Sequence, residues 1–187
     1  YKAVKKIKLI SVISGPLYKG VDVILKTAQL LKSHSLIDFE WNICGISKSD
    51  LIESVYEVKG KDVNVNYLGV LKQDDLKNNL LSSNFYIHPS YIDNSPNSVC
   101  EAQILGVPVI ACDTGGLGTI IKDKKTGFLV PANDPLMIAH LITKLSDDQD
   151  LLEKVSKASI SQASARHDKQ MIKEQLSAIY LKMIKSK

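Results

Sequence analysis

Two carboxylates stand eight residues apart in the segment YIDNSPNSVCEAQILGVPVIA, which spans residues 91–111. Glu101 lies four residues after Asn97 on the same face of an expected helix, and its side chain leans back toward the helix start. If that start binds an anion, a carboxylate beside it needs a neutral, hydroxyl-rich partner such as a ribose diol. Asp93, in the preceding loop, can meet hydroxyls beyond the anion. The spacing favours a site for sugar, diphosphate and ribose in sequence, and a capped helix with two exposed acids is the alternative.

The expected helix start is itself suited to an anion. Ser95 is a natural N-cap and Pro96 fits the first helical position. The free N–H groups of Asn97, Ser98 and Val99 would then point outward, and the helix dipole adds to their attraction for phosphate.

A second anion contact is predicted in the loop SGPLYKG, residues 14–20. Ser14 and Gly15 follow an expected strand, and Lys19 stands near the start of the next helix. The loop is neither a dinucleotide-binding GxGxxG fingerprint nor a Walker loop. A solvated lysine is the alternative to a phosphate contact.

The elements that must position these residues alternate between strand and helix along the chain. We predict strands over 8–14, 40–45, 63–70, 85–89, 107–112 and 127–130, and helices over 19–34, 48–59, 73–83, 135–145 and twice within 150–187. Such alternation predicts an α/β fold with a doubly wound, Rossmann-like parallel sheet of about six strands. Ligands of such sheets bind beyond the carboxyl ends of the strands, where strand order reverses.

Composition narrows the range of partners. The chain has 187 residues, 44% of them apolar, and a net charge of +4. A short basic cluster at Lys2, Lys5, Lys6 and Lys8 is interpreted as a solvated tail, and no nucleic-acid partner is expected. Arg166 is the single arginine, so any anion site before it must use lysine, backbone N–H groups or hydroxyls. Three widely spaced cysteines predict reduced, buried thiols in a cytoplasmic protein.

A set of short motifs carries a family resemblance. They are Lys19-Gly20, Tyr67-Leu68-Gly69, Pro89-Ser90, Asp93 to Glu101-Ala102, Gly106-Val107-Pro108-Val109-Ile110-Ala111, Gly115-Gly116 and Thr126-Gly127-Phe128-Leu129-Val130. In this order and spacing, the chain resembles the C-terminal half of retaining glycosyltransferases of family 4. Those enzymes have the GT-B architecture of two Rossmann-like lobes.

The resemblance implies roles for individual residues. It makes Asp93, Glu101 and Lys19 the catalytic candidates, with Asp93 on the transferred sugar, Glu101 on the ribose and Lys19 on the diphosphate. It places Asn94 and Ser95 at the sugar, and Asn97, Ser98 and Val99 at the diphosphate. Leu71 would lie at the nucleotide base. The family commonly has an arginine at or near Ser14 of the Ser14-Gly15 loop, which this chain lacks, and Asp93 is one methylene shorter than the usual glutamate.

The resemblance implies a donor-binding lobe, over 1–150, of a retaining hexosyltransferase that acts on a glycan, lipid or other acceptor. The donor would be UDP- or GDP-linked, with no cofactor and no metal, and the isolated lobe would be inactive. Helices in 151–187 would pack on this lobe or cross to an N-terminal acceptor lobe, which could also mediate peripheral membrane association. An epimerase or phosphorylase lobe of the same architecture and a non-catalytic nucleotide-binding module are the alternatives.

Overall fold

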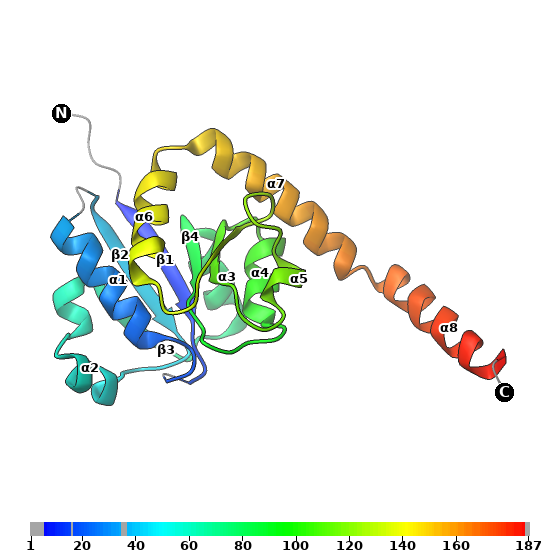
Figure 1. The fold of residues 1–187 in the computed structure, drawn as a ribbon, viewed down its shortest axis with the longest axis horizontal. Helices are drawn as coiled ribbons and strands as arrows, with labels where there is room; N and C mark the ends of the chain where they lie inside the picture. The colour runs from blue at the N-terminus through cyan, green and yellow to red at the C-terminus, as the bar shows by residue number, and fades with distance from the viewer. Residues whose placement is uncertain (1–5, 16, 35–36, 186–187) are drawn as a thin grey trace.

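The computed structural model describes residues 6–15, 17–34 and 37–185 of the chain. A six-stranded parallel sheet with the order β3-β2-β1-β4-β5-β6 forms its centre (Figure 1). The strands are β1 (Ile7–Val12), β2 (Phe39–Cys44), β3 (Val65–Gly69), β4 (Phe85–His88), β5 (Val109–Cys112) and β6 (Phe128–Val130). The predicted doubly wound α/β fold is therefore confirmed.

The helices follow the predicted alternation, with shifted ends. They are α1 (Val21–His34), α2 (Asp50–Tyr56), α3 (Gln73–Leu81), α4 (Asn97–Ile104), α5 (Leu117–Ile120), α6 (Pro135–Ser146), α7 (Gln149–Arg166) and α8 (Lys169–Lys185), with a 3-10 turn, η1, at Gly60–Val63. The helix predicted over 48–59 is shorter because Glu57 adopts the left-handed conformation, with φ of 54°, and ends α2. Gly60 opens η1 instead of ending that helix.

Helices cover both faces of the sheet, so successive strand residues enter different cores. Phe85 and Ile87 belong to a core shared with α1 and α6. Tyr86, between them, belongs to a second core with residues of α3, α4 and α5. This alternation is the ordinary consequence of the pleat, and it puts His88 on the same face of β4 as Tyr86.

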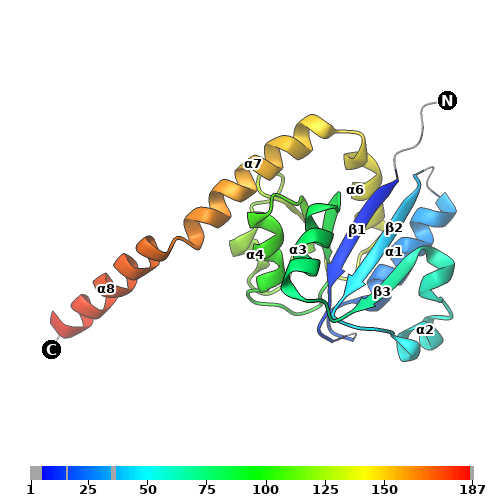
Figure 2. The same cartoon turned by 180° about the vertical axis from the view of Figure 1, so that it is seen from behind.

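The last two helices behave differently from each other. Helix α7 packs on the body of the domain, where Ser156 Oγ donates to Gly106 O at 2.6 Å and Arg166 donates to Gln103 Oε1 at 2.7 Å. Helix α8 extends away from the body in both views (Figures 1 and 2), and its side chains over 169–184 are exposed. None of the helices within the described residues is long and apolar enough to cross a membrane.

Two sequence interpretations concern charged residues at the ends of this fold. Of the basic cluster, Lys6 and Lys8 lie beside Glu40, with Lys6 Nζ 2.8 Å from Glu40 Oε2. Lys2 and Lys5 lie outside the described residues. The predicted free thiols are confirmed, because Cys44, Cys100 and Cys112 are unpaired and buried.

Candidate functional site

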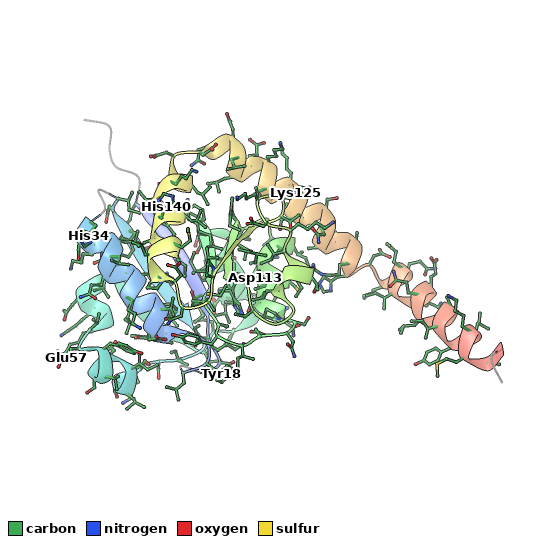
Figure 3. The ribbon with its side chains drawn as sticks, viewed as in Figure 1. Tyr18, His34, Glu57, Asp113, Lys125 and His140 are labelled. Atoms are coloured by element: carbon green, nitrogen blue, oxygen red, sulfur yellow. The ribbon has the colours of Figure 1, made fainter. Side chains whose placement is uncertain are left out.

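The loops that follow β1 and β4 meet at the point where strand order reverses. β1 pairs with β4, yet the chain continues from β1 to β2 on one side and from β4 to β5 on the other. Open α/β sheets bind ligands at such reversals. The loop after β1 carries Lys19 and the loop after β4 carries Asp93. Figure 3 shows Tyr18, in the first of these loops, at the end of the sheet toward which β1 points in Figure 1.

Backbone contacts hold these two loops together. Tyr91 N–H donates to Tyr18 O at 2.9 Å. Gly20 has φ of 75°, and a Cβ atom there would lie 2.2 Å from Pro89 O. A side chain at position 20 would therefore be strained twice, once by its own backbone conformation and once by the neighbouring carbonyl.

The Gly-Gly turn after β5 supports the Asp93 loop from the other side. Gly116 N–H donates to Asp93 O at 3.1 Å. A Cβ atom on Gly116 would lie 2.0 Å from Asn94 O, so only glycine allows this approach. The turn fixes the backbone of Asp93 and Asn94 before any ligand arrives.

The side chains of Lys19, Asp93 and His88 form a compact cluster between the loops. Lys19 Nζ and Asp93 Oδ2 form a hydrogen-bonded ion pair, and their side chains are 15% and 12% exposed. His88 Nε2 lies 3.0 Å from the same Asp93 oxygen. Because a carboxylate only accepts, the Nε2 atom of a neutral His88 carries the proton and donates it.

Burial determines the charge states of His88 and Tyr86. It lowers the pKa of His88 from 6.5 to about 4, with the negative charge of Asp93 opposing the shift and Lys19 adding to it. His88 is therefore neutral at pH 7. The Tyr86 hydroxyl lies 3.4 Å from His88 Nδ1 and donates to Ser98 Oγ at 2.8 Å. Burial also raises the pKa of Tyr86, so the hydroxyl keeps its proton.

The start of α4 differs from the prediction by one residue. Pro96, with ψ of 117°, is the N-cap, and Ser95 makes no capping hydrogen bond to any residue that the structure describes. The Pro96 carbonyl accepts from Val99 N–H at 3.1 Å, and Val99 is fully buried. The predicted roles of Ser95 as cap and of Val99 as an outward donor are therefore wrong. Among the described residues, the N–H groups of Asn97 and Ser98 have no hydrogen-bond partner, as predicted.

Glu101 lies outside the Asp93 cluster. Its side chain is exposed and makes no hydrogen bond or ion pair within the described part of the chain. It lines a groove of about 290 Å³ between α3 and α4, together with Gln73, Asp74, Leu76, Lys77, Leu80, Ile104 and Leu105. The structure thus brings Lys19 and Asp93 together and leaves Glu101 at the edge of a separate groove.

The remaining predicted site residues lie on loops at the same edge of the sheet. Ser14 is exposed and Gly15 is half-buried after β1, and Asn94 is exposed after β4. Leu71, after β3, is half-buried against the core that contains Tyr86.

Comparison with known proteins identifies the family. The family described as "Glycosyl transferases group 1" matches residues 2–162. The chain belongs to this family. The D-inositol 3-phosphate glycosyltransferase of Corynebacterium diphtheriae is 28% identical over 153 residues, which are 79% of this chain and 36% of that enzyme. The Corynebacterium kroppenstedtii enzyme of the same name is 30% identical over 139 residues, 71% of this chain and 31% of that enzyme. The chain therefore spans about a third of these relatives.

Solved structures give the same fold at low sequence identity. The C-terminal domain of a group 1 glycosyltransferase from Francisella tularensis matches with a TM-score of 0.69 and 18% identity, over 87% of this chain and 85% of that one. Sucrose-phosphate synthase from Thermosynechococcus elongatus matches with a TM-score of 0.79 and 20% identity, over 98% of this chain and 47% of that one. Anabaena HepE, solved with UDP-glucose, matches with a TM-score of 0.77 and 19% identity, over 93% and 49%. This member of the family thus has the Rossmann-like lobe that the resemblance implied.

His88 and Tyr86 are the residues beside the Lys19–Asp93 pair that sequence reasoning missed. Both stand in the short strand FYIH, and both face away from the core formed with α1 and α6. A signal was present in the sequence. Residues two apart on a strand share a face, and a histidine that ends a strand at the reversal of strand order is close to the ligand edge.

Proposed function

We propose that this domain binds the nucleoside diphosphate sugar donor of a retaining glycosyltransferase. The observation that carries the proposal is the Lys19–Asp93 pair at the strand-order reversal. A lysine ammonium and the free amides of Asn97 and Ser98 suit a diphosphate, and a carboxylate suits the hydroxyls of a sugar. Family membership supports the transfer chemistry, and the UDP-glucose bound to Anabaena HepE supports a donor of this class.

Each predicted site residue except Val99 receives a role in this proposal. The diphosphate lies against Lys19, Ser14, Gly15 and the start of α4. The sugar lies against Asp93 and the backbone of Asn94 and Ser95, the ribose against Glu101, and the base near Leu71. This order follows the Asp93 loop into α4, and it leaves the exposed Glu101 carboxylate open to accept from ribose hydroxyls.

Lys19 has a particular task in such a site. Charge builds on the diphosphate as the bond to the anomeric carbon breaks, and preorganised cations and N–H groups stabilise that charge. Lys19 is already ion-paired to Asp93, but an ammonium has three donors and can contact both groups. We propose that Lys19 bridges Asp93 and the diphosphate without a metal, in the absence of the arginine that the family commonly places beside it.

A second lobe completes the enzyme in this proposal and supplies the acceptor site, so the domain alone transfers no sugar. Helix α8 is the natural link, because Ile172, Leu176, Ile179 and Met183 are exposed on it at a spacing of three and four residues. We further propose a cytoplasmic reaction, in agreement with the unpaired cysteines, with any membrane contact made through the second lobe.

Saturation-transfer NMR with UDP- and GDP-linked hexoses tests the proposal. We expect saturation of both ribose and hexose protons for one of the two nucleotides, and its loss when the matching free nucleoside diphosphate competes. We expect no transfer of the hexose to an added acceptor by the domain alone. A protein that binds none of these donors would contradict the proposal, and conversion of the hexose to its epimer would favour an epimerase.

A further inference from the structure

His88 is a buried, neutral histidine that touches the carboxylate assigned to the donor sugar. We propose that His88 is a positioning residue, which holds Asp93 Oδ2 so that Asp93 Oδ1 faces the sugar hydroxyls. The inference rests on the proposed donor site and adds to it a residue that contacts no part of the donor.

The two oxygens of Asp93 are in different situations. Oδ2 accepts from Lys19 Nζ and from His88 Nε2. Oδ1 accepts from no residue that the structure describes, and the side chain is 12% exposed. Oδ1 is therefore the oxygen left for a ligand, and its direction is set by the two donors on Oδ2.

These two donors differ in how firmly they are placed. Lys19 has a flexible side chain, and in the proposed site its ammonium is shared between Asp93 and the diphosphate. His88 ends a strand that is buried at each residue, is itself 1% exposed, and stacks at 19° to the Tyr86 ring with 6.2 Å between ring centroids. When Lys19 also contacts a diphosphate, His88 is the firmer of the two contacts that keep Asp93 in place.

The surroundings of His88 favour a neutral hydrogen-bond donor over a second cation. The charged and titratable groups that face it are Asp93, Lys19 and Tyr86. Burial lowers its pKa to about 4, so the ring does not gain a proton near pH 7. A neutral ring adds no charge to compete with Lys19 for the diphosphate, and its single Nε2–H is directed at Asp93.

Two substitutions separate this hydrogen bond from simple packing. His88→Leu replaces the ring with an apolar side chain of similar size and removes the hydrogen-bond donor. His88→Gln places an amide N–H near the position of Nε2 and retains the donor. His88→Asn has the same amide on a shorter side chain that does not reach Asp93, so it is the matched control for His88→Gln if the leucine variant fails to fold.

The measurement is calorimetric titration of each variant with UDP-glucose and with UDP. We expect His88→Leu and His88→Asn to weaken UDP-glucose binding about tenfold or more while UDP binding changes less than about twofold. His88→Gln should restore most of the UDP-glucose affinity. Equal losses for both ligands, or no loss for either, would overturn the positioning role.

A second measurement does not depend on the donor. Nitrogen-15 NMR of the His88 ring in the parent domain should show the Nε2–H tautomer and no titration between about pH 5 and pH 8. A ring that titrates near its ordinary pKa overturns the inference even if the domain binds UDP-glucose. If the ring behaves as expected but the parent binds neither ligand, the proposed donor site is wrong, and the positioning role falls with it.

Discussion

The two acids of the Asp93–Glu101 segment occupy opposite kinds of environment. Asp93 is mostly buried, its backbone is held by the Gly115-Gly116 turn, and its side chain accepts from two donors. Glu101, eight residues later, has an exposed side chain that is bonded to no described residue. The first end of the segment is assembled without a ligand, and the second is open to solvent.

This difference predicts that the two acids contribute differently to the stability of the fold and to ligand binding. A group whose partners are in place before binding loses little entropy when the ligand arrives, but its removal disturbs the fold. An exposed group contributes to binding alone. Substitutions near Asp93 should therefore change both stability and affinity, and substitutions at Glu101 should change affinity only.

The largest effect is expected from Gly116→Ala, because the new Cβ atom would lie 2.0 Å from the backbone oxygen of Asn94. A backbone contact cannot be relieved by a side-chain rotation, so we expect the free energy of unfolding to fall by about 3 kcal/mol. The control is Gly118→Ala, whose Cβ would meet only the end of the Asp113 side chain at 3.3 Å. Urea unfolding of the two variants compares them, and equal midpoints would show that the turn does not support Asp93.

The next effect concerns Lys19→Ala. We expect affinity for a nucleoside diphosphate to fall about ten- to a hundredfold, since hydrogen bonds to charged groups are strong, while affinity for the nucleoside stays the same. Lys26→Ala is the matched control, because Lys26 is also ion-paired, to Asp22 at 3.2 Å, but belongs to α1. Calorimetric titration with both ligands provides the measurement. Equal losses of diphosphate affinity in the two lysine variants would contradict the assignment of Lys19 to the diphosphate.

The sequence was sufficient to predict the strands and helices of the fold. It was not sufficient to predict the side-chain contacts around Asp93. The alternating strands and helices could be predicted because they depend on local pattern. Lys19, Asp93 and Glu101 stay predicted site residues, which rest on the order of motifs. The Lys19–Asp93 pair could not be read, since it joins residues 74 positions apart through side-chain geometry.

The errors at the start of α4 have a similar cause. Ser95-Pro96 is a good cap and first turn by residue preference. In the structure, the Pro96 carbonyl accepts from Val99 and Cys100 and so takes the N-cap position itself. Residue preference does not reveal which of two adjacent residues turns out of the helix, because the surrounding loops decide it.

A smaller effect follows from acid acting on His88. Its pKa is about 4 in the folded chain, below 6.5, so the unfolded chain binds more protons between these values. The contribution of His88 to the free energy of unfolding is therefore full above about pH 6.5 and decreases as the pH falls toward 4. We expect the free energy of unfolding to fall by about 2 kcal/mol between pH 7 and pH 5. His88→Gln should flatten this dependence and His140→Gln, at an exposed position, should not. Urea midpoints across this pH range provide the measurement, and equal slopes for the parent and His88→Gln would refute it.

The smallest effect is expected at the open end, from Glu101→Gln. This change keeps the shape of the side chain and removes its charge, so affinity for a nucleoside diphosphate should fall by about 1.5 kcal/mol, the low end for a charged hydrogen bond, because the site is exposed. Stability should not change. The decisive comparison uses the 2′,3′-dideoxy nucleoside diphosphate, which the parent and the variant should bind equally.

Asp74→Asn, on the same groove, is the control for a general loss of negative charge. If Glu101→Gln weakened both ligands equally, or lowered the free energy of unfolding as Gly116→Ala should, Glu101 would not be an open ribose contact, and the contrast between the two ends of the segment would fail.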